Sequence, residues 1–175
     1  MRIINKCLSG KGFEKYIRNK KVARKIDKIV LHHTSDTLKQ WKKKEVSIGY
    51  YKKLYEGKGW KAGPHLFVAP EGIYLFTDIN IQGIHANSGN KGSIGVEMVG
   101  NYDKRLPSGK IWSNTKKVLL ILINRFNLKL KDIHFHREYN HKKSCPGRAI
   151  TKKWLRGKMK SVLAKVQTLS PSQQP

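Results

Sequence analysis

Apolar residues in this chain form two kinds of run. Short continuous runs bounded by turn residues are typical of buried strands, and apolar positions recurring every three or four residues are typical of amphipathic helices. We expect strands at 27–34, 65–69, 73–76, 93–100 and 133–136. We expect helices at 13–26, within 37–57, at 115–127 and at 151–166, the second ending at Gly57 and the third capped by Ser113 or Asn114.

The order of these elements predicts the fold class. The runs at 65–69 and 73–76 flank the turn tripeptide Pro70-Glu71-Gly72, which predicts a hairpin. Strands and helices otherwise alternate without an internal repeat, and 175 residues suit one domain. We therefore expect a single α/β domain, with a central mixed β-sheet flanked by α-helices.

The two ends of the chain differ from its middle. Residues 1–27 form a basic lead-in, 28–166 the main domain, and 167–175 a polar tail that we expect to be disordered. The helix within the lead-in has two interpretations. It either packs on the domain with a solvated charged face, or it anchors the protein to an anionic envelope.

The charge balance is extreme. There are 37 Lys and Arg against 11 Asp and Glu, a formal net charge of +26 at pH 7. Such a surface attracts nucleic acids, anionic lipids or acidic cell-wall polymers, and charge alone does not choose among them. A hydrophobic content of 38% excludes a disordered chain. Because the sequence lacks a four-ligand finger spacing and a dense aromatic–basic pattern, we expect no dedicated nucleic-acid partner.

Cysteine use and hydropathy bear on the compartment. Cys7 and Cys145 do not form the pattern of a disulfide framework, which suits a reducing compartment. The longest apolar run, 118–123, is far shorter than the ~20 residues of a membrane span, and the N-terminus lacks the apolar stretch of a signal peptide. We therefore expect a protein made in the cytoplasm without its own export signal.

Imidazoles and a thiol follow two strands that are distant in sequence. His32 and His33 end the first strand, His134 and His136 end the last, and Cys145 follows in a loop. Two neutral imidazoles and one thiolate are a ligand set that Zn²⁺ favours, and three protein ligands leave a fourth position open for water. The pattern therefore predicts a catalytic zinc site rather than a structural one.

Strand periodicity narrows this ligand set only in part. His32 and His33 are adjacent, so they point to opposite faces and only one can reach a given site. His134 and His136 share a face, so both stay candidates. Any single histidine is better explained as an ordinary core or surface residue, and only the combination with Cys145 favours a metal site.

Two charged residues add candidate catalytic groups. Glu97 is the one acid inside its predicted buried strand. A buried carboxylate is costly unless it has a partner or a task, and desolvation would raise its pKa toward that of a general base. Lys143 stands two positions before Cys145 and could stabilise an oxyanion. The plainer interpretations are that Glu97 faces solvent or pairs with a surface lysine, and that Lys143 is a solvated surface charge.

Several motifs resemble those of the zinc-dependent N-acetylmuramoyl-L-alanine amidases, which include phage lytic amidases and peptidoglycan recognition proteins. They are Val-Leu-His-His-Thr at 30–34, His-Ala-Asn at 85–87, Ser-Ile-Gly-Val-Glu at 93–97, and His-Arg-Glu at 136–138 with Lys-Ser-Cys-Pro-Gly at 143–147. The resemblance covers roughly residues 28–150 in the family's order. It implies that His32, His136 and Cys145 are the zinc ligands, in preference to His33 and His134.

The chain departs from the family at one position. Many members place a tyrosine that assists catalysis before the histidine of the hairpin strand, but here Pro64 precedes His65. Another branch carries a glutamate in the Ile-Gly-Val-Glu strand, where Glu97 stands. The departure therefore favours Glu97 as the catalytic base, with Lys143 stabilising the oxyanion.

The resemblance also implies a substrate and a setting. We expect a zinc-dependent hydrolase that cuts the amide between N-acetylmuramic acid and L-alanine in bacterial peptidoglycan, with His85 and Asn90 contacting substrate. We expect a monomeric phage endolysin that acts on the cell wall after release from the host cytoplasm, its basic surface binding anionic envelope polymers. The alternative is a non-catalytic module that binds peptidoglycan. Family members without the metal cysteine behave so, and the presence of Cys145 argues against it.

Overall fold

The structure, a computed structural model, describes the backbone of residues 1–168 and the side chains of residues 1–160. Its six strands form one sheet in the order β1-β4-β3-β5-β2-β6. The strands are β1 (Lys6–Leu8), β2 (Lys28–His33), β3 (Leu66–Val68), β4 (Ile73–Leu75), β5 (Ser93–Met98) and β6 (Ile133–Phe135). β3, β5, β2 and β6 are parallel, whereas β4 pairs antiparallel with both β3 and β1. The mixed sheet of a single α/β domain is confirmed.

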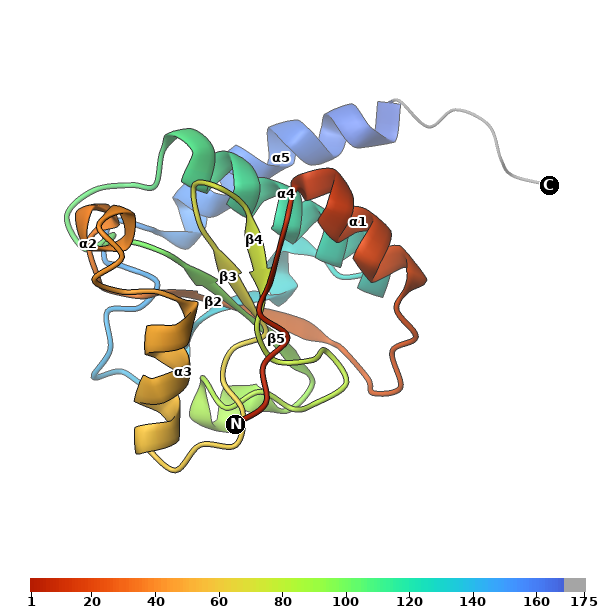
Figure 1. Ribbon diagram of the computed structural model, residues 1–175. Helices are drawn as coiled ribbons and strands as arrows, with labels where there is room; N and C mark the ends of the chain where they lie inside the picture. Colours follow the sequence, from red (N-terminus) through yellow and green to blue (C-terminus); the bar gives the residue numbers. More distant parts are fainter. Residues whose placement is uncertain (169–175) are drawn as a thin grey trace.

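Helices cover both faces of this sheet. They are α1 (Gly10–Asn19), α2 (Leu38–Lys42), α3 (Ile48–Gly57), α4 (Gly109–Phe126) and α5 (Lys152–Thr168), with 3₁₀ turns η1 (Asn87–Asn90), η2 (Leu130–Asp132) and η3 (His136–Glu138). α1, α4 and α5 gather on one side of the sheet, and α3 lies on the other (Figure 1). Tyr51 of α3 stacks on Phe67 of β3 with ring centroids 4.9 Å apart, which fixes α3 over its face. Within the described chain, no helix is long and apolar enough to cross a membrane.

The region predicted as one helix within 37–57 contains two. α2 ends at Lys42, and Lys44 has a φ of 61°, a left-handed conformation that cannot continue a helix. Ser47 then caps α3 by accepting a hydrogen bond from the Tyr50 amide. The helix predicted to end at Gly57 is therefore confirmed as α3, whereas the short helix α2 before it was not predicted.

α4 begins earlier than its apolar core suggested. Ser108 is its N-cap residue, not Ser113 or Asn114. Asn114 instead uses its side-chain nitrogen to donate to the Ala69 and Pro70 carbonyls, so it ties the helix to the β3–β4 turn. α5 continues to Thr168, and the rest of the tail predicted over 167–175 lies outside the described residues.

The lead-in before β2 is integrated into the same layers. β1 adds a strand to the sheet by pairing with β4, and α1 packs against α4. α1 ends at Asn19, short of the predicted 13–26, because the chain becomes extended at Lys20. Of the two interpretations of this helix, packing on the domain is what the structure shows.

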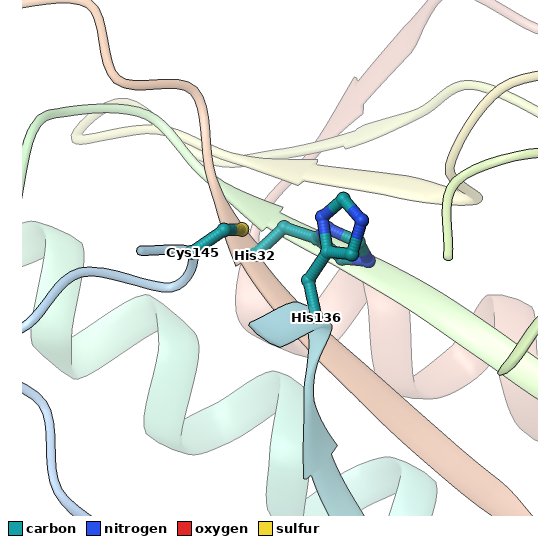
Figure 2. Close-up of side chains that lie close together, drawn as sticks. All are labelled: His32, His136 and Cys145. Atoms are coloured by element: carbon teal, nitrogen blue, oxygen red, sulfur yellow. The ribbon is translucent and has the colours of Figure 1, made fainter. Parts of the chain in front are cut away.

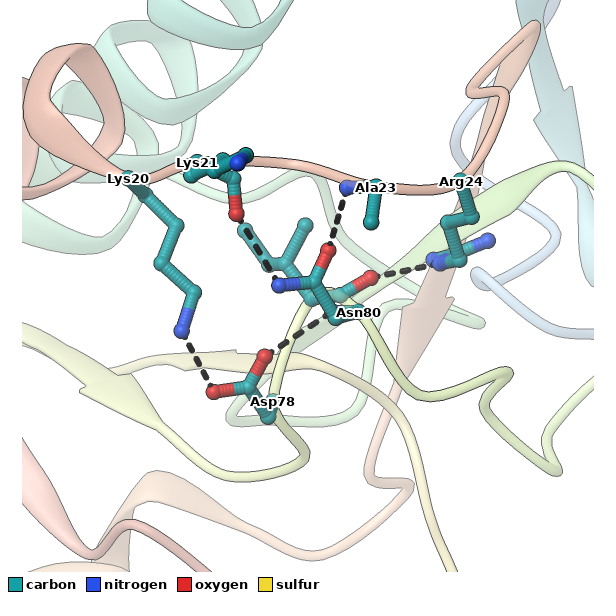
Figure 3. A network of polar contacts seen from close by, with 7 residues as sticks. Lys20, Lys21, Ala23, Arg24, Asp78 and Asn80 are labelled. Atoms are coloured by element: carbon teal, nitrogen blue, oxygen red, sulfur yellow. Dashed lines mark hydrogen bonds and ion pairs between the residues drawn. The ribbon is translucent and has the colours of Figure 1, made fainter.

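Residues 20–24, here called the strap, follow α1 and lead toward β2 (Figure 3). Lys20 forms a 2.7 Å ion pair with Asp78. Asn80 accepts from the Ala23 amide and donates to the Lys21 carbonyl, so its amide group binds the strap backbone from both sides. The strap is therefore fastened to the loop that follows β4.

Candidate metal centre and active site

The carboxyl ends of three parallel strands bring the predicted site together. The register pairs His32 of β2 with Glu97 of β5, and Leu31 with Phe135 of β6, so His136 follows beside His32. The candidate ligand atoms of His32, His136 and Cys145 all lie within 4.8 Å of one another. Figure 2 shows the three side chains arriving from β2, from the turn after β6 and from a separate loop. Strand ends of this kind are where open α/β sheets bind ligands.

The other two histidines of the motifs have different surroundings. His33 points to the opposite face, where its Nδ1 accepts from the Tyr102 amide at 3.1 Å and its Nε2 lies 3.1 Å from the Ser35 hydroxyl. His134 lies two residues before His136, with its Nδ1 3.3 Å from a Glu138 oxygen. The cluster thus contains the histidines that the resemblance selected.

Arg137 holds the loop that carries the cysteine. Its guanidinium donates to the carbonyls of Ser144, Gly147 and Ile150, at 3.0, 3.0 and 2.6 Å. Its backbone amide also donates to the Cys145 carbonyl at 3.0 Å. A planar fork with several donors suits a turn of converging carbonyls. Sequence reasoning missed this role, and the available signal was the position of Arg137 beside His136.

The protonation states suit a soft divalent metal. Burial lowers the pKa of His136 to about 4, assisted by the charge of Lys143. Burial likewise lowers the pKa of His32 well below its ordinary value, so both rings are neutral and keep a lone pair at pH 7. Burial raises the pKa of the Cys145 thiol, and a bound cation would reverse that preference toward thiolate. The donor set fits Zn²⁺ with one position open.

Glu97 faces the cleft of about 440 Å³ beside these ligands. It is 7% exposed and makes no hydrogen bond or ion pair with any described residue. Burial, together with the charge of Asp36 and against that of Lys58, raises the pKa of Glu97 to about 8. A carboxylate that takes up protons near neutral pH suits general acid–base chemistry.

One wall of the cleft is aromatic. Tyr50, Tyr51, Leu54 and Tyr55 of α3 line it together with Trp60. Tyr55 stacks on Trp60 at 5.2 Å, and the Tyr51 hydroxyl donates to Asp36 at 2.6 Å. The chain lacks a phenol before His65, but three phenols from α3 border the same cleft. Sequence reasoning read these residues as the apolar face of a helix, and the exposure of Tyr50, 42%, is visible only in the fold.

The remaining predicted residues take different positions. Lys143 lines the cleft beside the ligands. His85 also lines it, but its ring lies against His32, 3.0 Å from nitrogen to nitrogen. Asn90 does not border the cleft, because its side-chain oxygen accepts from the amides of His85 and Ala86 at 2.9 and 2.7 Å. Asn87 of the same loop does border the cleft.

Comparison with known proteins agrees with this geometry. The family model described as N-acetylmuramoyl-L-alanine amidase matches residues 22–148. Among curated proteins, none matches the chain.

Solved structures share the fold at low identity. The endolysin amidase LysCS from Clostridium intestinale URNW is 21% identical with a TM-score of 0.67, covering 81% of this chain and 92% of its own. The Ph2119 endolysin from a Thermus scotoductus bacteriophage is 22% identical with a TM-score of 0.62, covering 83% and 95%. A chain from the ectodomain complex of the peptidoglycan recognition proteins LCa and LCx, solved with tracheal cytotoxin bound, is 19% identical with a TM-score of 0.64, covering 78% of this chain and 84% of its own. With the family model matching most of its length, the chain belongs to the N-acetylmuramoyl-L-alanine amidase family.

Proposed function

We propose that this protein is a zinc-dependent N-acetylmuramoyl-L-alanine amidase that cuts the amide between N-acetylmuramic acid and L-alanine in peptidoglycan. The observation that carries the proposal is the meeting of His32, His136 and Cys145 beside a buried, unpaired carboxylate in one cleft. A recognition module has no need of a three-ligand metal set next to an acid of raised pKa.

An amide resists hydrolysis because water is a weak nucleophile and the amine is a poor leaving group. Zn²⁺ held by the three ligands would supply Lewis-acid polarisation of the carbonyl and acidify water. Glu97 takes the proton from the attacking water and returns it to the departing nitrogen. Burial raises its pKa to about 8 in the metal-free protein, and a bound cation would lower that pKa toward the carboxylate form that accepts the proton.

Lys143 has a separate role in this proposal. It borders the cleft, and its charge acts on both His136 and Cys145. An ammonium group at this position stabilises the negative oxygen that develops as the amide carbonyl is attacked. Its own hydrogen-bonding capacity is available for that oxygen, since it has no side-chain partner among the described residues.

The net charge of +26 supports a second part of the proposal. The basic surface concentrates the enzyme on anionic polymers of the cell envelope by long-range attraction. Together with the endolysins among its structural neighbours, this supports a phage endolysin that acts on the wall after release from the host cytoplasm.

The test is digestion of purified peptidoglycan by zinc-loaded and chelator-stripped protein, with the products identified by mass spectrometry. We expect stem peptides with a free L-alanine amine only when metal is present. The Cys145→Ser variant is the matched control and should behave as the stripped protein. Binding to the wall without any new ends would establish the recognition module instead. New reducing sugar ends would contradict the amidase chemistry.

A further inference from the structure

A buried chain of hydrogen bonds lies behind the ligand His32. The His32 Nε2 and His85 Nδ1 atoms are 3.0 Å apart, and both rings are almost fully buried. The His85 Nε2 lies 3.3 Å from the Ser93 hydroxyl oxygen, and that hydroxyl donates to the Asn90 carbonyl at 2.9 Å. His85 and Ser93 therefore connect His32 to a backbone carbonyl.

The direction of this chain follows from its far end. The Asn90 carbonyl can only accept a hydrogen bond, so the Ser93 hydroxyl donates its single proton there and offers a lone pair to His85. The His85 Nε2 must then carry a proton and donate it. Neither His85 nor His32 forms an ion pair with a described residue, and a neutral imidazole carries one N–H. The His85 Nδ1 is therefore an acceptor, and the His32 Nε2 is the donor.

We propose that His85 is a positioning residue that fixes the tautomer and orientation of His32, so that the Nδ1 of His32 is the metal-binding atom. This inference rests on the proposed metal site. Ligating histidines commonly donate their other N–H to an acceptor that sets ring orientation and ligand basicity. Here the acceptor is a second imidazole, itself oriented by Ser93.

The surroundings of the His85 ring are built to hold it there. A Cβ on Gly95 would lie 2.8 Å from two of its ring atoms, and one on Gly83 would lie 2.8 Å from its Cδ2. Both positions therefore require glycine for the ring to fit. The side-chain oxygen of Asn90 fixes the backbone of His85 by accepting a hydrogen bond from the His85 amide.

The arrangement also changes what we expect of His85 toward substrate. Its Nδ1 is engaged by His32 and its Nε2 by Ser93, so neither nitrogen is left to contact a ligand. The inferred role of His85 is therefore to support the metal ligand, in place of the substrate contact expected from the sequence.

The first test measures zinc affinity by competition with a chromophoric chelator. His85→Ala removes the acceptor and should weaken zinc binding about 10–100-fold. His85→Asn keeps an acceptor oxygen near the position of Nδ1 and should recover most of that loss. His141→Ala changes an exposed histidine and is the matched control, with affinity unchanged. If His85→Ala, shown to be folded by circular dichroism, binds zinc as tightly as the wild type, the inference is overturned.

A second test needs no substitution. Two-bond ¹H–¹⁵N correlation spectra of the zinc-loaded wild-type protein report which ring nitrogen of each histidine carries the proton. We expect His32 to be protonated at Nε2 and His85 at Nε2. Coordination of zinc by the Nε2 of His32 would overturn the inference. Neither readout uses hydrolysis, so a protein that passes both tests but leaves peptidoglycan intact would refute the amidase alone.

Discussion

Two adjacent histidines on β2 show how the two faces of the sheet differ. His32 and His33 are both buried, at 2% and 4% exposure. On the face of α4, His33 uses both ring nitrogens within the protein, on the Tyr102 amide and the Ser35 hydroxyl. On the face of α3, one nitrogen of His32 lies 3.0 Å from His85, and the residue belongs to the candidate ligand cluster. A structural histidine has both nitrogens satisfied by the fold, and a ligand keeps one.

The largest effect should come from replacing each histidine in turn. His32→Ala removes one of three ligands, so we expect zinc content after dialysis to fall to background and hydrolysis to vanish. His33→Ala should retain zinc but leave the buried Tyr102 amide without its acceptor, which costs about 1–3 kcal/mol of unfolding free energy. Metal analysis and urea unfolding measure the two effects. A folded His33→Ala protein without zinc would contradict this assignment of the faces.

The next largest effect concerns the acid beside His32. Glu97→Gln keeps the size of the side chain but removes its proton-accepting capacity, so we expect turnover to fall about 10²–10⁴-fold with zinc content unchanged. Glu45→Gln, an exposed acid outside the cleft, is the matched control. Near wild-type hydrolysis by Glu97→Gln would remove Glu97 from the mechanism.

Buried histidines on the cleft face of the sheet should also account for most of the stability that the metal-free protein loses in acid. Burial lowers the pKa of His65 to about 4, against an unfolded value of about 6.5. Between these values the unfolded chain binds more protons than the folded one, so the unfolding free energy falls as the pH falls. His65 alone should cost about 2 kcal/mol between pH 7 and pH 5, or about 4–8 °C in Tm.

Thermal melts of the metal-free protein across this pH range test the expectation. The Tm of His65→Gln should depend less steeply on pH, because one titrating group is gone. Some dependence should remain, because the other buried histidines still titrate. Equal slopes for the two proteins would mean that His65 is not held neutral by burial.

The smallest effect belongs to the exposed surface. Attraction between solvent-exposed charges is screened over about 10 Å at 0.1 M salt, so pelleting with purified wall should weaken several-fold between 0.05 and 0.5 M NaCl. Zinc content should not change over the same range of salt, because direct coordination bonds hold the metal and long-range attraction does not. Wall binding that is independent of salt would argue for specific contacts in place of net charge.

The part of the site that could be predicted from the sequence was which face of the sheet each strand residue points to. Strand periodicity separated His32 from His33, and the resemblance chose His136 over His134. The link between His32 and His85 was not predictable, because it joins residues far apart in sequence through space left by Gly95. Ser47 is a local signal for the start of α3. The sequence alone does not show that the helix before it has ended, because that depends on the left-handed backbone conformation of Lys44. β1 is short and exposed, so it lacked the apolar run by which the other strands were found.

The strap has a consequence for where the chain can be truncated. The family model begins at residue 22, within the strap and beyond β1 and α1. A fragment trimmed to that boundary would expose the backbone edge of β4 and uncover the face of α4 that α1 covers. Unprotected strand edges are templates for pairing with other chains. The part of this protein that sequence comparison recognises is therefore smaller than the part that should be expressed as a soluble unit.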